Sequence, residues 1–271
     1  MEHQLVFSDI DGTLLNAERE LSAATIKVIK RIKKDVPVVL ISSRMPAAMR
    51  HLQKELGIEN QPIICYNGGL ILIDGKTVHS TCIPLEFIEA LAKFNVEKKV
   101  HLSLYHEDEW YVPEYDFWAK REENNTKVCP KVSPIETIIE RWRVENKSAH
   151  KIMCMGEQVE IDRIYDFLKT NHGDAVHLYR SKPTYIEIAH KQISKLTSIN
   201  YLLKNHFQNR LENCVAFGDN YNDIEMLQAV GKGIAVENAK SEVLEIAHHV
   251  ADSSKNDGVA KTLEGLFPSQ G

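Results

Sequence analysis

The sequence lacks the long apolar run that a membrane span requires. No apolar segment approaches the ~18 residues of a spanning helix, and no basic segment followed by a long apolar stretch stands at the N-terminus. It also has no run of five or more lysines and arginines, and its formal net charge is −5. A broad nucleic-acid surface is therefore not expected. We predict a cytoplasmic protein, a monomer or weak dimer, whose partner is a small molecule rather than nucleic acid or a membrane.

Cysteine is scarce as well. The five cysteines lie far apart and form no CxxC pair; they are Cys65, Cys82, Cys129, Cys154 and Cys214. This spacing is typical of reduced, buried thiols and does not favour a zinc site. The twelve histidines form no HxH or HExxH motif, which indicates core or solvated roles for them.

The hydrophobic content of 43% is ordinary for a globular protein, and its pattern indicates alternating strands and helices. Short apolar runs that read as buried strands are separated by segments with helical periodicity. In the first part of the chain, strands are predicted at 4–9, 37–43 and 62–68, and helices at 22–35 and 46–57. This βαβαβ order predicts a parallel sheet.

The pattern changes after the third strand. Asp74-Gly75 between apolar segments predicts a hairpin, and from residue 84 the sequence mixes helices with alternating strands. The βα alternation resumes with a helix at 194–207 and a buried strand at 213–219. We therefore predict a core domain from 1–83 and 189–271 with a second domain inserted at 84–188.

Two apolar strands end in aspartates. VFSD delivers Asp9 and VAFGD delivers Asp219, and the carboxyl ends of parallel strands are where ligands bind. Asp11 lies two residues after Asp9, so an extended chain would put both carboxylates on one face, and Asp223 follows Asp219 closely. Two charges about 4 Å apart repel by roughly 4 kcal/mol at an effective dielectric near 20. The cluster therefore predicts a hard cation, Mg²⁺ in particular.

Four motifs stand in order along the chain. They are Asp9-Ile10-Asp11-Gly12-Thr13-Leu14-Leu15, Ser42 at a strand end, Lys195 opening a helix, and GDNYND at 218–223. In these residues the chain resembles the haloacid dehalogenase superfamily, and within it the Cof-like phosphatases with a type-two α/β cap. The resemblance implies an α/β fold, with a Rossmann-like parallel sheet core and an inserted α/β cap domain.

The resemblance also implies catalytic and metal-binding roles. Asp9 would be the nucleophile that forms an aspartyl-phosphate, and Asp11 the general acid and then the general base. Asp219 would complete the Mg²⁺ shell with Asp9 and the backbone carbonyl of Asp11. Lys195 would offset negative charge, with Asp223 orienting Lys195 or a metal-bound water.

Phosphate binding is assigned to a second set of residues. The resemblance implies that the Ile10 amide, Ser42 with the neighbouring amides around Ser43, and Asn222 hold phosphoryl oxygens together with Lys195. Arg44 is read either as a substrate contact or as a surface charge. Ser43 departs from the family pattern, which commonly has glycine there, and Glu237-Asn238-Ala239 stands where many relatives have GNA.

The expected activity is Mg²⁺-dependent hydrolysis of a small phosphate monoester, a sugar phosphate above others. True dehalogenases carry no second acid at the position of Asp11, which favours phosphoryl chemistry. A phosphomutase of the same superfamily and a non-catalytic phospholigand sensor are the alternatives. For Trp110 and Tyr111, core packing is preferred over a place in the pocket, and Asn67-Gly68-Gly69 is read as a turn rather than a ligand.

Overall fold

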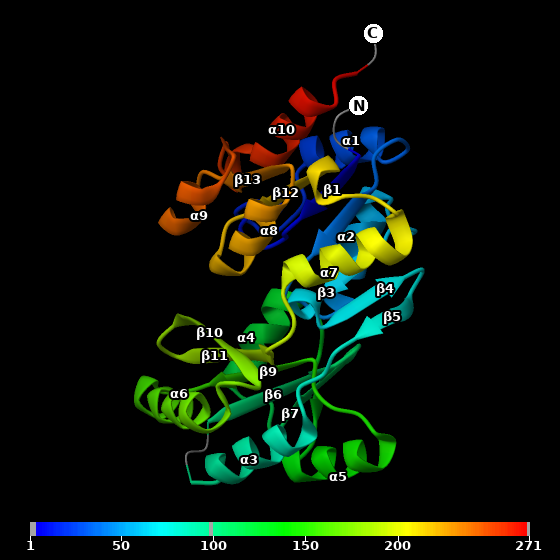
Figure 1. Ribbon diagram of the computed structural model, residues 1–271. Coiled ribbons are helices and arrows are strands. Elements are labelled where there is room, and N and C mark those ends of the chain that lie inside the picture. The colour runs from blue at the N-terminus through cyan, green and yellow to red at the C-terminus, as the bar shows by residue number, and fades with distance from the viewer. Residues whose placement is uncertain (1–3, 98–99, 270–271) are drawn as a thin grey trace. The chain divides into compact units, whose positions relative to one another are not determined.

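The computed structural model describes residues 4–97 and 100–269, which fall into two compact units (Figure 1). Unit 1 contains Met1–Ser43, Met49–Val78 and Ser194–Gly271, and unit 2 contains Arg44–Ala48 and His79–Ile193. That residues 84–188 act as a cap over a core remains a prediction. None of the described helices is long and apolar enough to cross a membrane.

The larger sheet has eight strands in the order β14-β13-β12-β1-β2-β3-β4-β5. All strands from β14 to β3 are parallel, and β4 pairs antiparallel with β3. The strands are β1 (Leu5–Ser8), β2 (Val38–Ile41), β3 (Ile63–Cys65), β4 (Leu70–Ile73), β5 (Lys76–Ser80), β12 (Cys214–Gly218), β13 (Lys232–Val236) and β14 (His249–Ala251). β1 pairs with β2 on one side and with β12 on the other, so the strand order reverses at β1. Such switch points are where open α/β sheets bind ligands.

Helices bury the apolar strands of this sheet. Leu5 and Phe7 of β1 share one core cluster with residues of α7, α8 and α9, among them Ile199 and Met226. Two of the remaining helices, α1 and α10, pack on each other. The helices are α1 (Ala23–Ile32), α2 (Ala47–Leu56), α7 (Lys195–Leu202), α8 (Ile224–Ala229), α9 (Ser241–Ile246) and α10 (Gly258–Leu266). The parallel α/β core is thereby confirmed.

Unit 2 holds a second sheet of six strands in the order β10-β11-β9-β6-β7-β8, which is antiparallel except between β7 and β8. The strands are β6 (His101–His106), β7 (Glu109–Val112), β8 (Lys131–Val132), β9 (Lys151–Met155), β10 (Val176–Lys182) and β11 (Tyr185–His190). Three helices cover one face and share its apolar core: α3 (Leu85–Asn95), α5 (Ile135–Glu145) and α6 (Gln158–His172). Trp142 of α5 is fully buried there.

One helix of unit 2 has no counterpart in the sequence analysis. α4 (Phe117–Thr126) buries only Ala119 and Thr126, so its sequence has almost no apolar periodicity to reveal it. It starts instead from a polar signal, because the side chain of Asp116 accepts a hydrogen bond from the Ala119 amide.

Several local predictions can be compared with the structure. Asp74 and Gly75 have φ values of 50° and 72° between β4 and β5, as a tight hairpin requires. Trp110 and Tyr111 are buried, which confirms core packing. The prediction of buried thiols is wrong for Cys129, which is exposed, and for Cys82, which is partly exposed.

Candidate active site

Asp9 and Asp219 lie side by side because β1 and β12 are neighbours. Ser8 is in register with Phe217, and the Asp9 amide donates to the Phe217 carbonyl at 3.0 Å. Both aspartates therefore leave the sheet at the same carboxyl edge, next to the switch point. Asp9 is buried, with 6% of its surface exposed.

Asp223 joins them through a short turn after β12. Its Oδ2 accepts hydrogen bonds from the amides of Asp219 and Asn220, both at 3.0 Å. Gly218 leaves room for this turn, since a Cβ at that position would lie 2.5 Å from Cβ and Cγ of Asp223. One ligating oxygen from each of Asp9, Asp219 and Asp223 lies within 4.8 Å of the others.

Lys195 supplies a buried cation to this acidic group. It is the first residue of α7, whose start is fixed by a capping box between Ser194 and Thr197. Its Nζ donates to Oδ1 of Asp9 at 2.5 Å and to Oδ1 of Asp223 at 2.6 Å. The lysine is 1% exposed, so neither bond is screened by water.

The charges at this edge do not balance. Burial, and then the charges of Asp223 and Asp219, raise the pKa of Asp9 well above its ordinary value, although Lys195 opposes the shift. Burial and Asp223 raise the pKa of Asp219 to about 6. Burial disfavours the charged form of Lys195, but Asp223 and Asp9 outweigh it and raise its pKa. One ammonium among three carboxylates leaves an excess of negative charge.

A hard cation fits this donor set. All three side chains offer only carboxylate oxygens, which Mg²⁺ prefers over nitrogen or sulfur donors. Asp219 is held in place from the first motif: Thr13 Oγ1 donates to its Oδ1 at 2.9 Å. Gly12 has a φ of 87°, and a Cβ on it would lie 2.5 Å from Oδ2 of Asp219. The glycine is therefore required both by its backbone conformation and by the nearby carboxylate.

The sequence predicted that Asp11 would join the acidic group, but the structure places it outside the group. The chain stops being extended after Ile10, whose carbonyl accepts from the amides of Leu14 and Leu15. The alternation that would place Asp9 and Asp11 on one face therefore ends there. In the structure Oδ1 of Asp11 accepts from Arg19 Nη2 at 2.6 Å, and this ion pair is half exposed. The expected convergence of four carboxylates is thus reduced to three.

The residues assigned to phosphate binding lie on neighbouring loops. Ser42 follows β2 and is buried, and its carbonyl accepts from the Asn67 amide at 2.9 Å. Asn222 Nδ2 donates to Asn67 Oδ1 at 3.0 Å. Asn67 is itself buried, with a φ of 55°, so reading it only as a turn residue missed its link to Asn222. The sequence did contain a signal for this role of Asn67, because a polar residue stands there in a turn directly after a buried strand.

Two further residues are placed by the structure. Arg44 is 7% exposed and its Nη1 donates to the Ala48 carbonyl at 3.2 Å, so the reading as a surface charge is wrong. Asn238 Nδ2 donates to the Gly12 carbonyl at 2.7 Å. The sequence at 237–239 departs from the family pattern but retains the asparagine. Asn238 supports the loop that carries Gly12.

Sequence comparison decides the family. The sequence model described as haloacid dehalogenase-like hydrolase matches residues 6–263. This chain belongs to the haloacid dehalogenase-like hydrolases. A putative phosphatase of Haemophilus influenzae is 30% identical to this hydrolase over 272 residues, covering 99% of this chain and 100% of the relative.

Other relatives agree with that assignment. A 5-amino-6-(5-phospho-D-ribitylamino)uracil phosphatase of Bacillus subtilis is 25% identical over 280 residues, with 97% of both chains covered. The crystal structure of a haloacid dehalogenase-like hydrolase from Bacteroides thetaiotaomicron superposes with a TM-score of 0.90 at 25% identity, covering 98% of this chain and 100% of that one. The hydrolase is accordingly a phosphatase.

Proposed function

We propose that this phosphatase hydrolyses a small phosphate monoester, a sugar phosphate above others, with Mg²⁺ as cofactor and Asp9 as nucleophile. The observation that supports this most strongly is the position of Lys195 Nζ between Asp9 and Asp223. The lysine donates to Oδ1 of Asp9 and so orients the carboxylate that we propose attacks phosphorus. The neighbouring Asp219 and Asp223 provide the negative charge that attracts a cation.

The reaction runs in two steps. In the first, a carboxylate oxygen of Asp9 attacks phosphorus, the ester P–O bond breaks, and Asp11 gives its proton to the leaving alkoxide. In the second, Asp11 takes a proton from water, and the resulting hydroxide displaces Asp9 and releases inorganic phosphate. Asp11 is half exposed in the structure, so it would leave Arg19, take up a proton from solvent and donate this proton to the substrate oxygen.

The remaining residues position and neutralise the phosphoryl group. The amide of Ile10, Ser42 with the amides around Ser43, and Asn222 hold phosphoryl oxygens, and Lys195 balances their charge. Mg²⁺ held by Asp9, Asp219 and the carbonyl of Asp11 supplies Lewis-acid stabilisation of the phosphoryl charge when bound.

The leaving group of the substrate is recognised by residues other than those that bind the phosphoryl group. All the residues assigned above recognise the phosphoryl group, so the leaving group must be selected by other parts of the chain. One relative acts on a compound whose phosphate is carried by a ribityl chain, a polyol resembling an open sugar. We infer a preference for hexose or pentose phosphates, with low selectivity because loosely polar pockets discriminate weakly.

Phosphate release from a panel of phosphorylated metabolites tests this function. The panel includes hexose, pentose and polyol phosphates, pyridoxal phosphate, nucleotides and a phosphopeptide, each with Mg²⁺ and with chelator. We expect the highest kcat/KM for a sugar or polyol phosphate and loss of turnover with chelator. The exposed-site variant Asp252→Asn serves as a control that should behave as wild type, since Asp252 lies in a half-exposed ion pair.

Three outcomes would contradict the proposal. A preference for the phosphopeptide over every sugar phosphate would overturn the substrate class. Full turnover in chelator would overturn the metal requirement. Isomerisation of a sugar phosphate without net phosphate release would identify a mutase instead.

A further inference from the structure

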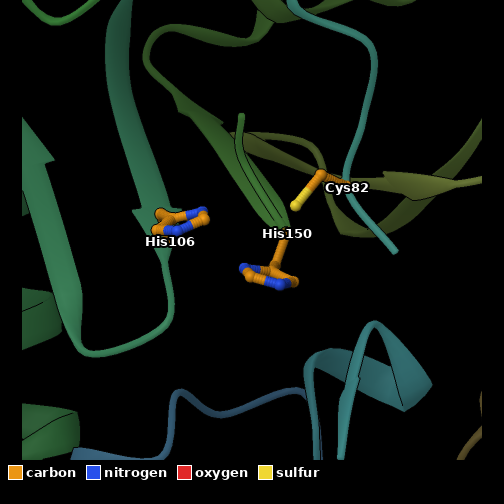
Figure 2. A group of neighbouring side chains, drawn as sticks. All are labelled: Cys82, His106 and His150. Carbon is orange, nitrogen blue, oxygen red and sulfur yellow. The ribbon is translucent and has the colours of Figure 1, made fainter. Parts of the chain in front are cut away.

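A second group of metal-binding side chains lies in unit 2, away from the aspartates. Cys82 stands between β5 and α3, His106 ends β6, and His150 immediately precedes β9. The sulfur of Cys82 and one nitrogen of each ring lie within 4.8 Å of one another. Figure 2 shows the sulfur and the two rings around one common space.

The backbone holds the three segments in this arrangement. The Ile83 amide donates to the Ala149 carbonyl at 2.7 Å, and the His150 amide donates to the Tyr105 carbonyl at 2.8 Å. Each of these bonds lies at or next to a residue of the cluster. Backbone hydrogen bonds therefore hold together the segments that carry the three side chains, as a specific site requires.

Hydrogen bonds also fix which ring nitrogens carry protons. His106 Nδ1 lies 2.7 Å from the Ser148 carbonyl, which can only accept, so Nδ1 is protonated and Nε2 has the lone pair. His150 Nδ1 accepts from the Glu107 amide at 3.2 Å, so its Nε2 carries the proton and donates to Ser80 Oγ at 2.9 Å. The N–H of each ring is thus anchored to an oxygen, the arrangement typical of metal-binding histidines, and the lone pair of His150 is on Nδ1, which accepts from the Glu107 amide.

We propose that unit 2 binds a zinc ion through the thiolate of Cys82, Nε2 of His106 and Nδ1 of His150. In tetrahedral zinc sites neighbouring N and S ligands lie about 3.3–3.6 Å apart. The Cys82 sulfur and one nitrogen of each ring lie within 4.8 Å of one another, so a contraction of at most about 1.5 Å between the ligand positions forms the site. His150 Nδ1 exchanges its long bond to the Glu107 amide for the ion. The fourth position is taken by water, and the partly exposed Cys82 gives the ion access from solvent.

The donor set separates this site from the aspartates. Sulfur and imidazole ligands suit zinc, whereas Mg²⁺ binds oxygen ligands. Burial raises the pKa of Cys82 to about 11, so without metal the sulfur is a thiol, and zinc displaces its proton to solvent. Burial and the nearby His106 lower the pKa of His150 to about 3, which keeps that ring neutral, the form that ligates metal.

Zinc here would join the segment that enters unit 2 to two strands of its sheet. Cys82 lies four residues beyond Val78, the last residue of unit 1 in this part of the chain. The ion would tie this segment to the ends of β6 and β9. Because the ion would bind the folded state, it should stabilise unit 2 and raise Tm.

Metal titration of the full-length, reduced and metal-stripped protein tests the site. Excess Mg²⁺ is present throughout, so that the aspartates do not take up the added ion. We expect one equivalent of Zn²⁺ to bind and raise Tm, and Co²⁺ to give a thiolate-to-cobalt charge-transfer band. Phosphate release is measured separately, so failure of the phosphatase proposal would leave this result interpretable.

Variants locate the bound ion. Cys82→Ser and His106→Gln should each weaken Zn²⁺ binding by at least about 100-fold, and Cys82→Ser should abolish the cobalt band. Ser80→Ala removes the hydroxyl that contacts both His150 Nε2, at 2.9 Å, and the Cys82 sulfur, at 4.0 Å, and should weaken Zn²⁺ binding by about 10–100-fold. Cys129→Ser is the matched control at an exposed thiol and should bind as wild type. An unchanged cobalt band in folded Cys82→Ser, loss of the band in Cys129→Ser, or no binding by the wild type would overturn the proposal.

Discussion

Lys195 Nζ lies 2.5 Å from Oδ1 of Asp9, a residue 186 positions away in the sequence. The same ammonium donates to Asp223, so one fully buried cation joins the loop after β1 to the turn after β12. Removing it would leave two buried carboxylates without their partner, which is the costly way to break an ion pair.

Lys195→Met should therefore lower the free energy of unfolding by about 3 kcal/mol or more at neutral pH without divalent metal. Urea unfolding followed by circular dichroism measures the change. Lys261→Met is the matched control, because Lys261 forms an exposed pair with Asp252 at 2.5 Å. That substitution should cost less than about 1 kcal/mol. An equal decrease in the free energy of unfolding of the two variants would show that the buried ion pairs of Lys195 stabilise the fold no more than an exposed pair does.

Asp9→Asn should separate activity from stability. Loss of the proposed nucleophile should reduce turnover by at least about 10⁴-fold. Because the folded-state pKa of Asp9 is raised, its contribution to stability is full below the unfolded pKa and is lost as pH rises through the folded pKa. Asparagine does not titrate, so the variant lacks this pH dependence. Its free energy of unfolding at neutral pH without metal should therefore not be lower than that of wild type.

The measurement for Asp9→Asn is urea unfolding from about pH 4 to about pH 8 in chelator, together with steady-state phosphate release. The variant should show a flatter stability profile than wild type on the neutral side. Near-native turnover in this variant would refute Asp9 as nucleophile, and a steeper profile would refute the account of its burial.

Gly12→Ala should weaken metal-dependent activity. The new Cβ would lie 2.5 Å from Oδ2 of Asp219 and would also be strained by the φ of 87°. Gly75→Ala has comparable backbone strain at a φ of 72° but meets nothing within 4 Å. Both should lose about 1 kcal/mol of stability or more, whereas only Gly12→Ala should raise the Mg²⁺ concentration needed for half-maximal phosphate release. If Gly75→Ala raised this Mg²⁺ concentration by a similar amount, backbone strain alone would explain the effect of Gly12→Ala.

His101 should make unit 2 less stable in acid. Burial lowers its pKa from 6.5 in spite of Asp116, whose Oδ2 lies 2.9 Å from Nδ1. A base with a lowered folded pKa contributes stability above its unfolded pKa and loses it as pH falls toward the folded value. Unfolding free energy should therefore decrease below about pH 6.5, by at most about 1.4 kcal/mol per pH unit.

Unfolding of His101→Gln as a function of pH isolates this effect. The variant should lose less stability than wild type as pH falls, while His249→Gln, at an exposed position of β14, should keep the wild-type pH dependence. If His101→Gln lost stability in acid as steeply as wild type, groups other than His101 would be responsible for the acid sensitivity.

Local sequence patterns predicted much of this fold because burial imposes them. The apolar runs at β1, β2 and β12 are buried at every residue, as strands covered on both faces must be. The Asp74-Gly75 turn follows from the few residues that tolerate positive φ. α4 was missed for the converse reason, since a helix with little buried surface leaves no periodic signal.

The sequence by itself determined the chemistry available at the sheet edge, because the aspartates end apolar strands whose carboxyl ends must meet there. Only the tertiary structure decided which carboxylates meet: Asp219 and Asp223 lie beside Asp9, while Asp11 turns to Arg19. It also brought together Cys82, His106 and His150, whose spacing along the chain matches no metal motif. Ligand geometry depends on distances in space, and strand pairing between distant segments sets those distances.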